Sequence, residues 1–150
     1  MTKRVLPVLF VALLALGLCH AGDGPKNEFA ELEGTWTIVK MEIEDKSLLE
    51  KNEKWKLVIK DGKVTADAKN RSQEALQLAK ILDPGKKPKT VTLPYEGKVT
   101  FYGIYEVKGD ELRVCGDGVD TASEKNPEAR RPKKFDSKEG LLLVFKREKK

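Results

Sequence analysis

The clearest alternation of apolar and polar residues lies in Phe101–Cys115, around the central pair Gly109-Asp110. A two-residue loop that begins with glycine suits a type II′ turn, which joins the two strands of a hairpin. With that loop, one face is apolar: Tyr105, Val107, Leu112 and Val114. The other face carries two opposite-charge pairs, Glu106 with Arg113 and Lys108 with Glu111. A slip of one residue would set charges against apolar side chains, so the pattern predicts a well-specified hairpin.

A second hairpin is predicted around Asp61-Gly62, between strands at Trp55–Lys60 and Lys63–Ala68. Its apolar residues share one face: Trp55, Leu57, Ile59, Val64, Ala66 and Ala68. Lys56 then lies opposite Asp67 on the outside. Trp55 is a candidate for stacking on a ligand, but we favour core packing because all its alternation partners are apolar.

Further strands are predicted at Thr35–Ile43, Thr90–Leu93 and Leu141–Lys146. In the first of these, the apolar positions change phase between Ile38 and Val39, which indicates a β-bulge or a sharp bend. The last strand is apolar on both faces, so we expect it to pair centrally or to be covered on its outside.

Two segments are harder to interpret. Glu74–Leu82 has a composition that favours helix, while its leucine spacing also allows an alternating strand. The surrounding strands and the turn sequence Asp83-Pro84-Gly85 lead us to predict a strand. Gly116–Gly140 is polar and without periodicity, so we predict a long loop, of the kind that is usually functional or disordered.

The first 21 residues are predicted to be a secretory signal peptide. A short basic start precedes an apolar run at Val5–Leu18, and Cys19-His20-Ala21 places small residues where a signal peptidase cleaves. The run is short for a membrane span, so no span is expected after cleavage. Lipidation of Cys19 is the alternative, and Leu18 disfavours it because a small residue normally precedes a lipidated cysteine. We therefore expect an exported protein, periplasmic, envelope-bound or extracellular.

Cleavage changes the chemistry of the remaining single domain, 22–150. Loss of Lys3 and Arg4 lowers the formal net charge from +5 to +3, with interspersed charges that do not indicate nucleic-acid binding. His20, the only histidine, is also removed, which excludes Ser-His-Asp and Cys-His catalysis and histidine-ligated metals. Cys115 remains alone, so no intrachain disulfide can form.

Four groups are candidates for chemistry, each with a plainer interpretation. Cys115 is a redox-sensitive thiol or, as we favour, a small buried hydrophobe. Asp117–Asp120, with Ser123 and Glu124, offers oxygens to Ca²⁺ but does not match an EF-hand, and an acidic loop is favoured. Arg130–Lys134 is a basic cluster suited to a sulfated or phosphorylated polymer or a lipid head group, against a solvated loop. A glycosidase requires two carboxylates held at a fixed distance. Glu96 and Glu106 are the candidates, but nothing in the sequence fixes their separation.

Several spaced motifs together resemble one family: Gly34-Thr35-Trp36 after Leu32, Lys87–Val91, Gly103–Glu106, Gly109–Leu112, Arg131-Pro132 before Phe135, and Leu141–Arg147. They are similar to the small, uncharacterised lipocalin-like domain of secreted planctomycete proteins. The resemblance implies an antiparallel up-and-down β-barrel of about eight strands, and we expect one helical turn at Glu28–Glu33 before it. It also implies that Trp36 closes the base of the barrel under a stacked arginine, with Arg147 the first candidate and Arg113 the second. The function of the family is unknown, so the resemblance implies no activity.

The sequence thus predicts an all-β, non-enzymatic domain with no catalytic residue, metal or cofactor. Our first hypothesis is a binding module that holds a small apolar or amphipathic ligand, or a peptide, in or across the barrel mouth. The alternative is a structural or protein-interaction domain of the cell envelope with a packed interior. Candidate contacts for a ligand, an envelope protein or an anionic polymer are Trp55, Tyr105, Arg130 and Arg131, and we expect a monomer. An enzyme is the third and weakest hypothesis, which two close carboxylates in a cleft would revive.

Overall fold

The computed structural model describes residues 28–51, 53–68, 71–72, 75–94 and 97–150. The predicted signal peptide 1–21, Cys19 and Glu96 lie outside these residues. A 3₁₀ helix, η1 (Ala30–Leu32), precedes the first strand. The strands are β1 (Gly34–Ile43), β2 (Lys46–Ser47), β3 (Lys56–Lys60), β4 (Lys63–Ala68), β5 (Arg71–Ser72), β6 (Leu76–Gln77), β7 (Leu82–Asp83), β8 (Lys89–Pro94), β9 (Val99–Lys108), β10 (Glu111–Asp120) and β11 (Leu141–Arg147). Two helices interrupt them, α1 (Leu78–Ile81) and the 3₁₀ helix η2 (Pro127–Arg130).

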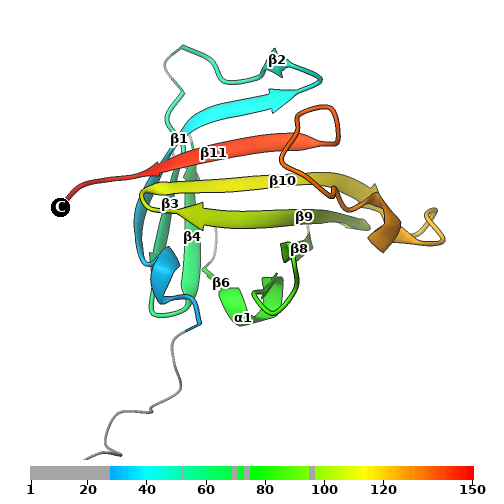
Figure 1. The fold of residues 1–150 in the computed structure, drawn as a ribbon, viewed down its shortest axis with the longest axis horizontal. Coiled ribbons are helices and arrows are strands. Elements are labelled where there is room, and N and C mark those ends of the chain that lie inside the picture. The colour runs from blue at the N-terminus through cyan, green and yellow to red at the C-terminus, as the bar shows by residue number, and fades with distance from the viewer. Residues whose placement is uncertain (1–27, 52, 69–70, 73–74, 95–96) are drawn as a thin grey trace, which may run out of the picture.

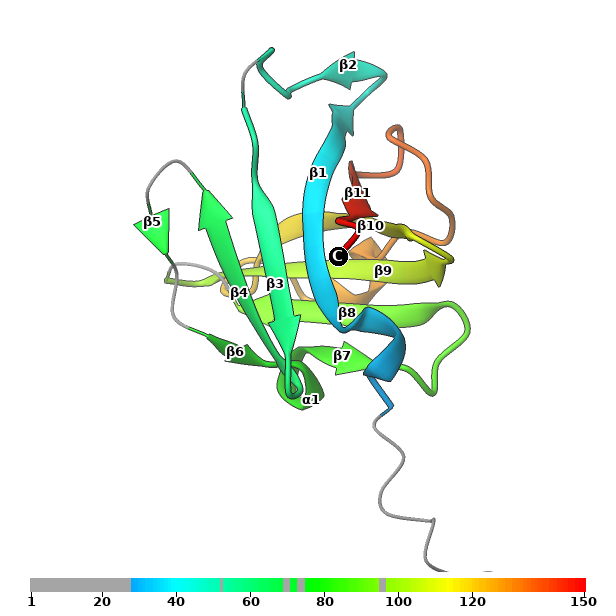
Figure 2. The ribbon, with the colours of Figure 1, turned by 90° about the vertical axis from the view of Figure 1, so that its left-hand side faces the viewer.

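The strands form one strongly curled antiparallel sheet, a half-barrel with the order β5-β4-β3-β1-β11-β10-β9-β8-β7. Most neighbours in the sheet follow each other in the chain; the exceptions are β1 with β3, which skips the short β2, and β1 with β11. At the far ends, β6 pairs with β4 and β7 pairs with β8. The continuous stretch 76–83, with α1 at its centre, therefore spans from β4 to β8 (Figure 2).

Both predicted hairpins are confirmed in register. In the β9–β10 hairpin, Glu106 pairs with Arg113 and Lys108 with Glu111. Its turn places Gly109 at φ +58°, as a type II′ turn requires at its first position. In the β3–β4 hairpin, Lys56 pairs with Asp67. There both turn residues have positive φ, 51° at Asp61 and 71° at Gly62, which is the type I′ pattern.

The predicted irregularity in the first strand is also confirmed. Ile38 pairs with Phe145 of β11, but Lys40 pairs with the next residue, Val144, so Val39 is the extra residue of a bulge. Beyond the bulge, Met41 takes the core-facing position, whereas Val39 is 48% exposed. The bulge therefore turns Lys40 to the outer face of the sheet.

The prediction of a strand over Glu74–Leu82 was wrong for its central part, where α1 forms; Glu74 itself lies outside the described residues. Leu78, Ile81 and Leu82 stand three and four positions apart, so one helical turn directs all of them at the core. Leu78 is only 2% exposed. One helical turn contains too few residues for its periodicity to be distinguished from the alternation of a strand. The helical turn forms because it buries Leu78.

The predicted loop Gly116–Gly140 begins too early, because β10 continues to Asp120. Gly116 pairs with Gly103, and the ring of Phe101 lies over both glycines. A Cβ atom on Gly116 would come within 2.6 Å of Phe101 Cε1, so only glycine fits. Glycines carry no apolar side chain, which hid this strand from the hydrophobic pattern. The remaining stretch, residues 121–140, is hereafter the cover segment.

Side chains fill the concave side of the sheet. The buried core there consists of Phe29, Leu32, Trp36, Ile38, Met41, Ile59, Leu78, Val91, Tyr105, Leu112 and Phe145. A second, smaller cluster lies on the convex side: Ile104, Cys115, Leu142 and Val144, with Phe135 of the cover segment packed on it. Both expectations for the last strand are met, since β11 lies between β1 and β10 (Figure 1) and its outer face is covered.

Candidate functional site

Arg147 and Trp36 close one end of the half-barrel. The guanidinium Cζ of Arg147 lies 4.2 Å from the centroid of the Trp36 ring. The same guanidinium donates hydrogen bonds to the carbonyl oxygens of Glu31, at 2.7 Å, and Glu33. Trp36 Nε1 donates to the carbonyl of Leu32 at 2.8 Å. The carbonyls at the end of η1 are therefore satisfied by the two side chains, which fix η1 against the core.

Gly34 makes this arrangement possible. Its φ of +131° is a conformation that L-residues rarely adopt, and a Cβ there would lie 3.4 Å from an Nη1 atom of Arg147. Arg113, the second candidate for the stack, lies elsewhere and pairs with Glu106 and Glu111. The structure thus explains Gly34 by its backbone conformation, because the distances from such a Cβ position to Arg147 are those of ordinary van der Waals contact.

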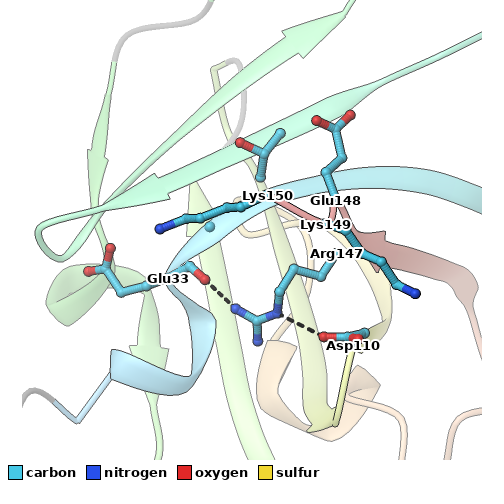
Figure 3. Close-up of a pocket in the computed structure, with 8 residues that line it drawn as sticks. Glu33, Asp110, Arg147, Glu148, Lys149 and Lys150 are labelled. Carbon is cyan, nitrogen blue, oxygen red and sulfur yellow. Dashed lines mark hydrogen bonds and ion pairs between the residues drawn. The ribbon is translucent and has the colours of Figure 1, made fainter.

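A surface hollow of about 620 Å³ adjoins Arg147 (Figure 3). This end hollow is lined by Glu33, Gly34, Thr35, Asp110, Arg147, Glu148, Lys149 and Lys150. Its acids and bases are equal in number and several are already paired. Arg147 Nε lies 3.4 Å from Asp110, and Glu148 accepts from Lys56 and from Thr37. The end hollow therefore has no excess charge with which to select a ligand.

Arg131 joins the cover segment to the sheet through hydrogen bonds. Its five N–H donors have five acceptors: two oxygens of Glu128, the carbonyls of Val91 and Gly103, and Thr92 Oγ1. The guanidinium also lies 5.3 Å from the centroid of the Tyr102 ring. Only 11% of the side chain is exposed. Arg131 therefore has no donor left for a ligand in this conformation.

The basic cluster Arg130–Lys134 is not a continuous cationic patch. Arg130 points to Asp117, with Nη2 and Oδ2 3.0 Å apart, and Lys134 pairs with Asp136 at 3.3 Å. Asp117, a candidate calcium ligand, is thus engaged by Arg130. Within the described residues, no group of three or more acidic, histidine or cysteine side chains is placed to hold a metal ion.

The two aromatic candidates have different environments. Tyr105 is 3% exposed within the core, and its burial, followed by the charge of Glu31, raises the pKa of its hydroxyl to about 12. Trp55 is half-buried just before β3, and its Nε1 donates to Glu53 Oε1 at 2.8 Å. The structure therefore separates the predicted contacts, with Trp55 and Tyr105 on the core side and the two arginines on the outside.

Cys115 is fully buried on the convex side, beneath the cover segment. Its Sγ lies 3.5 Å from the carbonyl oxygen of Asp136. Burial raises the pKa of the thiol, so the reactive thiolate is disfavoured. The position agrees with the interpretation as a small hydrophobe.

A second hollow, of about 350 Å³, lies on the convex side and was not anticipated from the sequence. This outer hollow is lined by Lys40, Glu111, Arg113, Phe135, Leu142 and Val144. It combines an apolar floor with charged walls. The bulge in the first strand was the available signal, because it brings Lys40 outward, but the pairing of β1 with β11 was needed to place Lys40 beside Val144.

The charges of the outer hollow are firmly held. Glu111 accepts from Lys146 and from Arg113, each at 2.7 Å, and these bonds, Lys146 first, lower its pKa to about 2. Arg113 uses its Nε and Nη1 groups for Glu111 and Glu106. Its Nη2 group has no acceptor among the described residues.

No family model matches this chain, and neither a curated protein nor a solved structure is significantly similar to it. In the part of the chain that the structure describes, no helix has the length and apolar character needed to cross a membrane.

Proposed function

We propose that this protein is an exported, non-enzymatic interaction domain of the cell envelope that works through its outer surface. The observation that carries the proposal is the filled concave side of the sheet. Large side chains, among them Trp36, Tyr105 and Phe145, occupy the space in which a ligand-carrying barrel holds its ligand. The predicted signal peptide supports export, and the absence of histidine from residues 22–150 excludes histidine-dependent catalysis from the processed protein.

A lipocalin-like architecture forms part of the proposal. The circular neighbour order of the strands, with β1 beside β11, is that of an up-and-down meander. The stack of Arg147 on Trp36 behind Gly34 supports the same assignment. We therefore propose a small lipocalin-like domain in which side chains have replaced the internal ligand.

One observation favours a second candidate, a ligand held across the end of the sheet opposite to Trp36. Two apolar side chains at that end continue the core-facing positions of their strands but remain exposed, Ile43 at 40% and Val99 at 37%. Leu48, directly after β2, is 48% exposed. The three side chains would offer apolar contact to a small amphipathic molecule or a peptide. This is the role that the sequence favoured first.

Native mass spectrometry of the processed protein, isolated from its own cells, separates the two candidates. If the domain acts through its surface, the measured mass under conditions that keep it folded is expected to be that of the polypeptide alone. An adduct that leaves on mild unfolding and is bound at the open end would contradict the proposal and support the ligand carrier. The double variant Ile43→Ser with Leu48→Ser is the control. It would abolish an adduct that is bound at the open end, and a protein without an adduct would remain without one.

A further inference from the structure

We propose that the outer hollow is a binding site for a carboxylate that carries a short aliphatic chain. The register of three adjacent strands builds it. Lys40 of β1 pairs with Val144 of β11, and Val144 pairs with Arg113 of β10. Paired residues lie side by side on one face, so the two cations flank one apolar residue. Neighbouring strands are about 4.8 Å apart, which puts the backbones of Lys40 and Arg113 about 10 Å apart, with the carboxylate site between their side chains.

An apolar channel leads away from this charged end. Leu142 is two residues from Val144 on the same strand and face, and both are almost fully buried at the floor. Phe135 of the cover segment packs on the same cluster and forms the far wall. An aliphatic chain that runs from Val144 to Phe135 removes apolar surface from water along its length.

The charges set the orientation and class of the ligand. Arg113 keeps its Nη2 donors unpaired among the described residues, and Lys40 is held only by Glu42 at 3.1 Å. Glu111 lies on the side of Arg113 away from Leu142, and Glu42 pairs with Leu142 on the other side, so the carboxylate is confined between these two acids, at Lys40 and Arg113. The aliphatic chain then extends over the apolar floor toward Phe135. A free short-chain acid and the apolar C-terminal residue of a peptide present the same chemistry.

The inference rests on the proposed function, because it assigns a ligand class to the outer surface. A titration of the methyl-labelled full protein with 4-methylpentanoate, followed by NMR, tests it. We expect saturable shifts of the Leu142 and Val144 methyl signals, with the neutral 4-methylpentanamide producing none. Acetyl-alanyl-leucine in parallel identifies the source: tighter binding than the free acid indicates a peptide C-terminus, and weaker binding indicates a free acid.

Charge variants supply the matched control. Lys40→Gln is expected to weaken binding about threefold to fivefold, as loss of one exposed ion pair of up to about 1 kcal/mol allows. Lys108→Gln removes a lysine from the same outer face, paired with Glu106 but outside the hollow, and is expected to change nothing. Arg113→Gln removes the second cation of the hollow and is also expected to weaken binding. If Arg113→Gln folds poorly, Lys40→Gln still tests the site.

The outcomes are distinguishable. Equal affinity in Lys40→Gln, or no saturable shift at Leu142 and Val144, overturns the carboxylate site and leaves the proposed function standing. Shifts confined to the interior methyls of Ile59 and Leu112 overturn both, because they would show a ligand on the concave side of the sheet.

Discussion

At the scale of single residues, two arginines perform the same structural task at opposite faces of the sheet. Arg147 joins η1 to the core side through Trp36 and two backbone carbonyls. Arg131 joins the cover segment to the outer side through the carbonyls of Val91 and Gly103. In each case the several donors of a planar guanidinium join an irregular segment to the sheet: Arg147 of β11 binds carbonyls at the end of η1, and Arg131 of the cover segment binds carbonyls of β8 and β9. Neither arginine is therefore available as a recognition residue.

Replacement of Arg147 tests this structural role. Arg147→Ala removes the cation–π contact and leaves the carbonyls of Glu31 and Glu33 without their donor, so we expect a loss of about 2–3 kcal/mol in the free energy of unfolding. Lys149→Ala, two positions away and without an ion pair among the described residues, should stay within about 0.5 kcal/mol of the wild type. Urea unfolding of both variants measures the difference. Similar stability of the two would refute the role given to Arg147.

Tyr105 gives a prediction for alkaline pH. Its pKa is raised to about 12 by burial in the folded protein, whereas an unfolded tyrosine titrates near 10. The folded state therefore keeps its proton longer, so this contribution to stability is complete below pH 10 and is lost as the pH rises toward 12. Urea midpoints from pH 8 to pH 11 should fall more steeply for the wild type than for Tyr105→Phe. Parallel curves would show that Tyr105 ionises normally in the folded protein.

Contacts between side chains could be predicted from the sequence, whereas contacts from a side chain to distant backbone could not. The register of both hairpins follows from side-chain alternation and turn residues, so the partners of Glu106 and Lys56 were predictable. The position of Arg147 against Trp36 was expected from a resemblance. The acceptors of Arg131 are mostly backbone carbonyls of distant strands, which no pattern of side chains indicates.

At the scale of elements, the segments that the sequence misjudged are those that tertiary contacts define. The turn α1 exists because Leu78 and Ile81 fill the space between β4 and β8. The second half of β10 exists because Gly103 and Gly116 leave room for the ring of Phe101. Propensity and periodicity are local signals, and both outcomes were decided by packing against residues far away in the chain. The outer hollow was missed for the same reason, since it needs three strands in register.

The cover segment gives a prediction at this scale. Arg131→Gln removes most of the hydrogen bonds that join the cover segment to β8 and β9, so local opening should become easier and Cys115 beneath it more accessible. We expect the rate of Cys115 alkylation in the folded protein to rise at least tenfold. Arg130→Gln, which loses only the exposed pair with Asp117, should leave the rate within about twofold of the wild type. Equal rates in the two variants would show that Arg131 does not hold the cover segment.

At the scale of the whole molecule, the central strand of the sheet comes from the end of the described chain. β11 pairs with β1 on one side and with β10 on the other, and it contributes to the buried clusters on both faces. Without it, the two halves of the sheet would share no hydrogen-bonded ladder across this position. The cohesion of the domain therefore depends on seven residues.

Deletion of residues 141–150 tests that dependence. We expect the truncated protein to lose its cooperative urea transition and its near-ultraviolet circular dichroism, because β1 and β10 would expose unpaired edges and both clusters would lose their contacts with β11. Deletion of Lys149 and Lys150 alone should leave both signals intact. A cooperative transition in the longer deletion would show that the two halves fold independently.

The pairing of β1 with β11 also has a consequence for synthesis. The hydrogen bond from Thr37 to Glu148 joins positions 111 residues apart, so the edge of β1 that pairs with β11 must wait for almost the entire domain to be made. During that interval β1 can pair with β3, and β3 with β4, but the other edge of β1 has no partner. An incomplete sheet with an unpaired edge is prone to aggregation, so we expect the proposed export to depend on a chaperone that shields the apolar strands until the last one is made.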